Sequence, residues 1–274
     1  MSDKIAFIGV GNMATATLRG ITVNSADMSN IVLYNRHIEK IEKYRESGAY
    51  IATSIKEAVE NAKYVMLCVK PQNFPEILAP LDDCEKVSEK IFITMAAGIT
   101  MQTVEDATHG AAVIRVMPNT PMLIGKGVIA ICRNDKVSDC DFGYVCNIFA
   151  SSGSVIKIRE EEMNRIICVT GSSPAYVFML IKAMCEGAHS QGLLDESSSL
   201  SEKELQDAIC DTIIGAAELM KSGNKSPDEQ IATVASKGGT TERAISELEK
   251  FDFSEGVVSA MAKCTERAEE LGRK

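Results

Sequence analysis

The first 160 residues alternate short apolar runs with charged, amphipathic stretches, and this alternation constrains the fold more than any other feature. It is the pattern of β-α-β units that build a parallel sheet with helices on both faces. Strands are predicted at 4–9, 31–34, 64–69, 91–95, 112–117, 128–132 and 154–158, and helices at 12–23, 38–47, 55–62, 73–81, 101–107 and 141–150. The amino-terminal part is therefore expected to be an α/β domain.

From residue 160 onward the strand signal ends, and apolar residues recur at helical spacing. Two helix starts carry capping boxes, Ser201 with Glu204 and Ser226 with Glu229. A third helix start is predicted at Ser173 and Pro174, ahead of an apolar helix suited to a core or a subunit contact. We therefore expect two domains, an α/β domain at 1–159 and an all-helical domain at 160–274.

Composition excludes several classes of protein. The 274 residues include 29 Lys and Arg against 38 Asp and Glu, a net charge of −9, whereas binding to a nucleic-acid backbone requires a basic surface. No secretion signal is visible, and the longest uncharged stretch, 166–181, is expected to be too short and too interrupted by small residues and Pro174 to span a bilayer. We predict a cytoplasmic protein without nucleic-acid or membrane partners.

The nine cysteines are scattered along the chain, and no two have the two-residue spacer of a zinc or redox site. Several lie inside apolar runs, as Cys68 does. Free buried thiols in a reducing compartment are the expected interpretation, and no metal site is predicted.

A glycine-rich turn, Gly9-Val10-Gly11-Asn12-Met13-Ala14, follows the first apolar run and opens an amphipathic helix. Such a turn lets a pyrophosphate approach backbone N–H groups at the helix amino terminus. The alternative is a merely tight turn. The position of this motif at the end of the first strand of an α/β pattern favours dinucleotide binding.

The end of the second strand indicates which dinucleotide binds. An acidic residue there would hydrogen-bond the ribose 2′-hydroxyl of NAD, but the chain has Asn35 and Arg36. A guanidinium suits the 2′-phosphate of NADP. The alternative is that Arg36 is a solvated charge beside Glu39.

Three further loops follow predicted strands, where open α/β sheets place ligands. They are Val69-Lys70-Pro71, Ala96-Ala97-Gly98 and Met117-Pro118-Asn119-Thr120-Pro121. Small residues in the second loop would permit close approach of a nicotinamide, and the prolines of the third fix its backbone around Asn119. Each loop could equally be ordinary turn chemistry.

In the helical half, Ser236-Lys237-Gly238-Gly239-Thr240-Thr241 precedes a predicted helix. Two glycines and two threonines at a helix start present N–H donors and hydroxyls together, which suits a carboxylate. The alternative is a carboxyl-terminal cap followed by an amino-terminal cap. The three histidines form no nucleophile arrangement that the spacing supports.

With these motifs in order, the chain resembles the pyrroline-5-carboxylate reductase family over essentially its whole length. The resemblance rests on GVGNMA at 9–14, VKP at 69–71, AAG at 96–98, RVMPNTP at 115–121, GSSPAYVF at 171–178 and SKGGTTERAISELE at 236–249. It implies a Rossmann-type dinucleotide-binding domain followed by a helical domain that interlocks with a partner in a dimer. It also implies reduction of L-1-pyrroline-5-carboxylate to L-proline, the last step of proline synthesis, with NADPH preferred and NADH possible.

The resemblance also assigns roles to residues. It places Gly9, Gly11, Asn12 and Met13 at the pyrophosphate, Asn35 and Arg36 at the 2′-phosphate, and Val69, Lys70, Pro71, Ala97, Gly98 and Asn119 on the ribose and nicotinamide side. Ser236, Gly238, Gly239, Thr240 and Thr241 match the loop that holds the substrate carboxylate. Thr241 is the implied proton donor or hydrogen-bond partner of the ring nitrogen.

Two positions depart from the family pattern. The family usually has SGSGP and SPGG where this chain has Ser173 and Lys237 in the corresponding segments. Ser173 could narrow the approach to the substrate, and Lys237 adds a cation near an anionic substrate. Two alternatives therefore stay open: a reductase of another small anionic cyclic imine, and a non-catalytic NADP-binding sensor.

Overall fold

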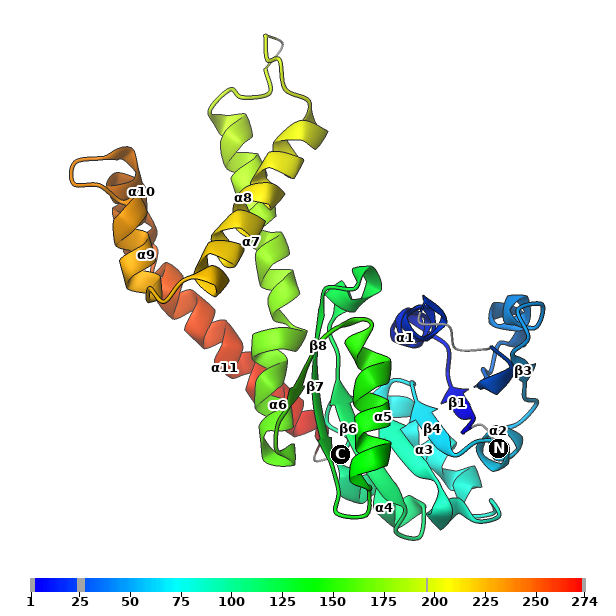
Figure 1. The fold of residues 1–274 in the computed structure, drawn as a ribbon. Helices are drawn as coiled ribbons and strands as arrows, with labels where there is room; N and C mark the ends of the chain where they lie inside the picture. The colour runs from blue at the N-terminus through cyan, green and yellow to red at the C-terminus, as the bar shows by residue number, and fades with distance from the viewer. Residues whose placement is uncertain (1–2, 24–27, 196, 273–274) are drawn as a thin grey trace. The chain divides into compact units, whose positions relative to one another are not determined.

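Eight strands form a single sheet in the order β3-β2-β1-β4-β5-β6-β7-β8 (Figure 1). In this computed structural model, residues 3–23, 28–195 and 197–272 are described. The strands are β1 (Ile5–Ile8), β2 (Ile31–Tyr34), β3 (Tyr50–Ile51), β4 (Tyr64–Leu67), β5 (Ile91–Thr94), β6 (Ala112–Met117), β7 (Gly127–Arg133) and β8 (Gly153–Lys157). Neighbouring strands run parallel except β6 and β7, which are antiparallel. The strand order reverses beside β1, so the topological switch point lies at the glycine-rich turn.

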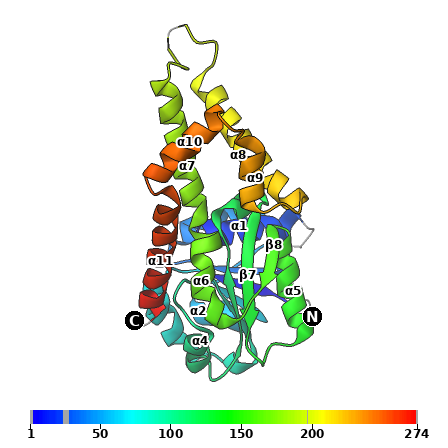
Figure 2. The ribbon, with the colours of Figure 1, turned by 90° about the vertical axis from the view of Figure 1, so that its left-hand side faces the viewer.

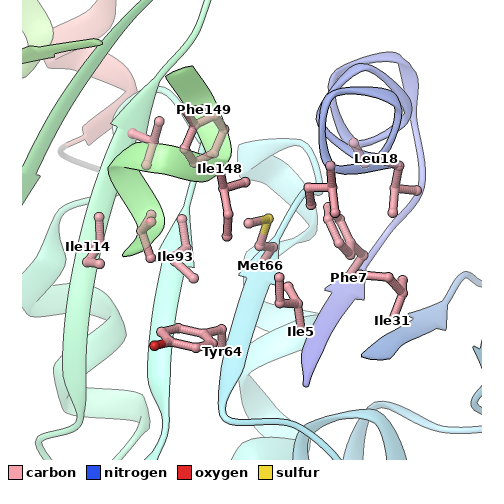
Figure 3. Packing of buried hydrophobic residues seen from close by; sticks show 14 of the residues in the cluster. Ile5, Phe7, Leu18, Ile31, Tyr64, Met66, Ile93, Ile114, Ile148 and Phe149 are labelled. Atoms are coloured by element: carbon pink, nitrogen blue, oxygen red, sulfur yellow. The ribbon is translucent and has the colours of Figure 1, made fainter. Parts of the chain in front are cut away.

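Helices cover both faces of this sheet, as predicted. They are α1 (Asn12–Val23), α2 (Ile55–Glu60), α3 (Phe74–Leu78), α4 (Met101–Ala107), α5 (Asp139–Ala150) and α6 (Met163–Ile166). Successive strand residues point to opposite faces, so Ile5 and Phe7 pack with α1 and α5, whereas Ala6 and Ile8 pack with α2, α3 and α4. Figure 3 shows the first cluster, in which Leu18 and Phe149 lie over the strands.

Two predicted helices are wrong or shortened. The segment 38–47 forms two 3₁₀ turns, because its apolar residues Ile38, Ile41 and Tyr44 recur every three residues, the period of a 3₁₀-helix, and only Ile41 is buried. The segment 73–81 contains the short helix α3 between 3₁₀ turns, where Pro75 and Pro80 remove backbone donors. The two-residue strand β3 was not predicted, since it is too short to show an alternating pattern.

The apolar segment around Pro174 is one continuous helical run, so the expectation that small residues and Pro174 interrupt it is wrong. The helical run Glu160–Ser190 is continuous, and by length and composition alone it could span a bilayer, although almost none of its most apolar part is buried. A π-helical turn at Ile167–Gly171, closed by the Ser172 N–H donating to the Ile167 carbonyl at 2.8 Å, precedes α7. Since Pro174 has no N–H to donate to the Thr170 carbonyl, the Asn119 amide donates to it instead, at 2.9 Å.

The remaining helices are α7 (Ser173–Ser190), α8 (Glu202–Ser222), α9 (Pro227–Val234), α10 (Thr240–Lys250) and α11 (Phe253–Gly272) (Figure 2). Both predicted capping boxes are present, at Ser201 and at Ser226. Within this helical part α7 packs along α8. Only Leu205 and Ile209 are buried among the described residues of 173–262. The helical part therefore has almost no core of its own.

By packing, the chain forms two units, residues 1–172 with 263–274, and residues 173–262. The first includes the start of the helical run because Met163 is buried in the core on one face of the sheet. It also includes the end of α11, where Ala268 is buried and the Cys264 thiol lies 3.1 Å from the Ser172 hydroxyl. The α/β unit is thus built from two separate pieces of sequence.

Candidate active site

The glycine-rich turn requires glycine at its first position. Gly9 has φ of +87°, and a Cβ there would lie 2.7 Å from Cγ1 of Val69 and 3.2 Å from the Cys68 carbonyl oxygen. Its N–H donates to the Tyr34 carbonyl at 2.8 Å, which ties the turn to the end of β2. Burial raises the pKa of the adjacent Cys68 thiol, so this thiol is neutral at physiological pH.

The start of α1 is open. A Cβ at Gly11 would meet nothing within 4 Å, and Gly11 and Asn12 are exposed while Met13 is partly buried. The first turn of α1 contains no acidic residue. Free backbone donors, open space and no carboxylate fit a pyrophosphate.

Asn35 has a role that the sequence did not reveal. Its Oδ1 accepts a hydrogen bond from the Val10 N–H at 3.2 Å, and its Nδ2 donates to the His37 carbonyl at 2.8 Å. Both ends of the amide are therefore used inside the protein. The side chain thus braces the glycine-rich turn, and it also lines the cavity described next, so its place at a 2′-phosphate stays a prediction.

A cavity of about 260 Å³ lies beside this turn. Its walls come from the turn, the end of β2, the loop after β4 and α3, and include Gly9, Asn35, Arg36, Val69, Asn73 and Glu76. The Arg36 guanidinium forms an ion pair with the Glu76 carboxylate, and the two side chains are 60% and 61% exposed. The cavity thus lies at the topological switch point of the sheet, where open α/β sheets bind ligands, with one arginine on its wall.

The loop after β4 is shaped by Lys70 and Pro71. Lys70 is exposed, and its carbonyl accepts the Asn73 N–H at 2.9 Å as the chain enters the 3₁₀ turn Pro71–Asn73. This turn leads into α3 and fixes where Glu76 lies. The loop thus shapes one wall of the cavity.

The loop Ala96–Gly98 consists of small residues, and the structure shows a packing reason for this that the sequence did not reveal. Gly98 has φ of +79°, and a Cβ there would lie 2.8 Å from the Gly272 nitrogen and the Leu271 carbonyl carbon. The end of α11 therefore packs directly against this loop. Ala96 is buried and Ala97 is partly buried beside it.

Asn119 is buried, and both ends of its amide make a hydrogen bond. Its Oδ1 accepts the Val128 N–H at 2.9 Å, while its Nδ2 donates to the Thr170 carbonyl. The side chain joins the loop after β6 to β7 and to the π-helical turn. It therefore holds this loop in place, and its contact with a nicotinamide stays a prediction.

Arg115 is a buried residue that the sequence reasoning did not single out, although it stands in the otherwise apolar strand AVIRVM. Its Nη2 donates to Asn164 Oδ1 at 2.8 Å, and its Nη1 lies 3.5 Å from Glu160 Oε1, which also accepts the Met101 N–H at 2.7 Å. Burial lowers the pKa of Arg115, and Glu160 opposes this. Arg115 thus ties β6 to the start of α4 and to the helical run.

The predicted carboxylate loop lies in the helical unit. Gly238 has φ of +76° and its N–H donates to Glu242 Oε2 at 2.6 Å, while the Gly239 N–H donates to the Ser236 carbonyl at 2.9 Å. These two glycine N–H groups are therefore occupied. Thr240 follows as the first residue of α10, and there the backbone N–H groups lack intrahelical partners.

Thr241, the second residue of α10, lines an apolar groove of about 410 Å³. The groove is formed by α8, α9 and α10, with lining side chains that include Leu219, Met220, Ile231, Val234 and Ile245. A hydroxyl at a helix amino terminus is thus combined with an apolar surface. This combination suits a small apolar ring that carries one carboxylate. In the described part of the chain, no cluster of His, Cys, Asp or Glu is arranged to hold a metal.

Comparisons with known proteins give a consistent result. Residues 160–271 match the family model described as pyrroline-5-carboxylate reductase dimerisation, and residues 4–98 match the model described as NADP oxidoreductase, coenzyme F420-dependent. The chain is 33% identical to pyrroline-5-carboxylate reductase of Corynebacterium melassecola, over 98% of each chain. It is 31% identical to the enzyme of the same name from Escherichia coli, over the full length of both.

A solved structure, pyrroline carboxylate reductase of Plasmodium falciparum with NADP bound, is also similar. It superposes with a TM-score of 0.87 at 25% identity, and the match covers 99% of this chain and 98% of that one. Both packed units of this chain therefore have counterparts in one known structure.

Proposed function

Because this chain belongs to the pyrroline-5-carboxylate reductase family, we propose that it reduces L-1-pyrroline-5-carboxylate to L-proline, the last step of proline biosynthesis. The main support is that the chain has both features such a reaction needs. These are the glycine-rich turn at Gly9 and the helix start at Thr240–Thr241 beside an apolar groove. When bound, the reduced nicotinamide supplies the hydride that saturates the C=N bond.

The α/β part, 1–159, is proposed to hold the cofactor. The open start of α1 takes the pyrophosphate, and Arg36 takes the 2′-phosphate, so NADPH is preferred and NADH is accepted. The loops at Val69–Pro71, Ala97–Gly98 and Asn119 shape the ribose and nicotinamide side. Their backbones are fixed from behind by Gly9, by α11 and by the Asn119 amide.

The helical part, 160–274, is proposed to bind the substrate. Ser236, Gly238, Gly239, Thr240 and Thr241 form the carboxylate loop, in which the glycines shape the turn and the threonines supply donors. Thr241 is proposed to hydrogen-bond or protonate the ring nitrogen. A protonated imine is itself an electrophile, so positioning would contribute more than acid–base catalysis.

The direct test is absorbance-monitored oxidation of NADPH by the purified protein with pyrroline-5-carboxylate, repeated with NADH and with the six-membered analogue. We expect turnover with the five-membered ring to exceed that with the six-membered ring, and NADPH to be used in preference to NADH. Preference for the six-membered ring would favour the reductase of another cyclic imine. Tight NADPH binding without oxidation would instead identify a sensor.

A homo-oligomer built from interlocked dimers is proposed because the helical unit, 173–262, buries only Leu205 and Ile209 among its described residues. Apolar side chains of α7 are exposed, Phe178 by 62% and Met179 by 71%, and the groove lined by Leu219 and Val234 is apolar. Since residues 160–271 match a dimerisation model, we propose that a second copy covers these surfaces. Burial in such an interface, rather than in lipid, would account for the apolar run Glu160–Ser190.

Phe178→Asp should therefore dissociate the oligomer, because it places a charge in an interface that excludes water. Light scattering after size exclusion should give a smaller particle than the unmodified protein. Ile38→Asp is the matched control: it adds the same charge at an exposed apolar residue of the α/β unit, 45% exposed, and should leave the mass unchanged. An unchanged mass for Phe178→Asp would contradict the proposed interface.

A cytoplasmic location is proposed from the nine cysteines, all of which are free thiols. Free thiols persist in a reducing compartment. The net charge of −9 is consistent with a small-molecule substrate and with no nucleic-acid partner.

A further inference from the structure

We propose that Glu76 is a specificity-determining residue that weakens the preference for NADPH, because its carboxylate competes with the 2′-phosphate for Arg36. The proposal rests on the proposed function, since it concerns the cofactor cavity described above. It goes further in assigning a role to the acidic residue that lines that cavity.

The carboxylate is fixed in position by the fold. Glu76 lies on α3, which follows the 3₁₀ turn after Lys70 and is anchored by buried Phe74 and Ile77. Arg36 lies at the end of β2, forty positions earlier in the chain. Their ion pair thus joins the end of β2 to α3, and both residues line the same cavity.

The charges on the cavity wall are few. Among the residues that line it, Glu76 is the one acidic residue and Arg36 the one permanently charged base. A 2′-phosphate carries nearly two negative charges. When NADPH binds, its 2′-phosphate competes with Glu76 for the Arg36 guanidinium, and the nearby carboxylate repels the phosphate. NADH carries a hydroxyl at that position, so its binding does not involve this competition.

The two side chains are about three-fifths exposed, so solvent and salt screen the competition. The effect on binding should consequently be moderate. We expect Glu76→Gln to tighten NADPH binding by about twofold to fivefold, and to change NADH binding by less than about twofold. The gain for NADPH should shrink in about 0.5 M salt, where the Debye length is only a few ångströms.

The experiment measures Kd for NADPH and NADH by cofactor fluorescence on the full chain without substrate, so its readout is independent of turnover. Glu39→Gln is the matched control, because Glu39 lies three residues from Arg36, pairs with His37 at 3.3 Å and does not line the cavity. This variant removes the same charge and should leave the ratio of the two Kd values within about twofold of the unmodified protein.

A double-mutant cycle with Arg36→Gln completes the test. If Glu76 acts through Arg36, Glu76→Gln should have a smaller effect on NADPH binding in the Arg36→Gln background. Unchanged or weaker NADPH binding by Glu76→Gln alone would overturn the proposal. If the unmodified protein bound neither cofactor, the proposed function would fail instead, which keeps the two failures distinct.

Discussion

Thr241→Ala should lower kcat for pyrroline-5-carboxylate by about a hundredfold, the usual range for losing one group that donates a hydrogen bond or proton in the transition state. Thr241 is the second residue of α10 and lines the apolar groove, where water would have to replace its hydroxyl. Because the cofactor turn lies in the other unit, Kd for NADPH should stay close to that of the unmodified protein. Steady-state kinetics and cofactor titration measure the two effects separately.

Thr241→Ser is the control for this variant, since it keeps the hydroxyl and removes only a methyl group. It should retain most of the kcat. If Thr241→Ala kept full turnover while its oligomer mass and NADPH binding were unchanged, the proton would come from water. The assignment of Thr241 would then be wrong, whereas the reductase activity itself would stand.

Gly153→Ala should strongly destabilise the protein, with a loss of about 4 kcal/mol or more in the free energy of unfolding. Gly153 has φ of +148°, and a Cβ there would lie 2.0 Å from the Gly127 carbonyl oxygen. These two glycines face each other in the β7–β8 pair, so the clash is with backbone that cannot move without breaking the pairing. Urea denaturation followed by circular dichroism measures the loss.

Gly143→Ala provides a control of opposite sign. Gly143 lies inside α5, and a Cβ there would meet nothing within 4 Å. Alanine at such a helical position should stabilise the protein by about 0.5 to 1 kcal/mol. Equal unfolding midpoints for the two variants would contradict the prediction, because they would show that position 153 accepts a Cβ beside the Gly127 carbonyl.

The sequence was sufficient where local pattern and tertiary packing agree. The elements β2, β6, α1 and α4 have the predicted bounds, because each combines an apolar face with a clear start or stop signal. The pattern was misread at 38–47, where apolar residues recur every three residues, which suits 3₁₀ turns better than an α-helix. It also failed at the π-helical turn, whose hydrogen bonds compensate for Pro174 through a side chain far away in sequence.

The site divides in the same way. The requirement for glycine at position 9 could be predicted, because it follows from a local turn. The Arg36–Glu76 pair, the tether formed by Arg115 and the packing of α11 against Gly98 could not, since each joins residues distant in the chain. Asn35 and Asn119 were found by their positions after strands, but their partners became visible only in the fold.

The two-piece construction of the α/β unit sets an order of events during protein synthesis. Domains that are continuous in sequence can fold as soon as they leave the ribosome. Here the loop at Gly98 packs against Leu271 and Gly272, which are translated after the whole of 173–262. That contact therefore cannot form until the helical unit has been synthesised. The apolar side chains of α7 and α8 are therefore synthesised, and exposed on the nascent chain, before the last piece of the α/β unit.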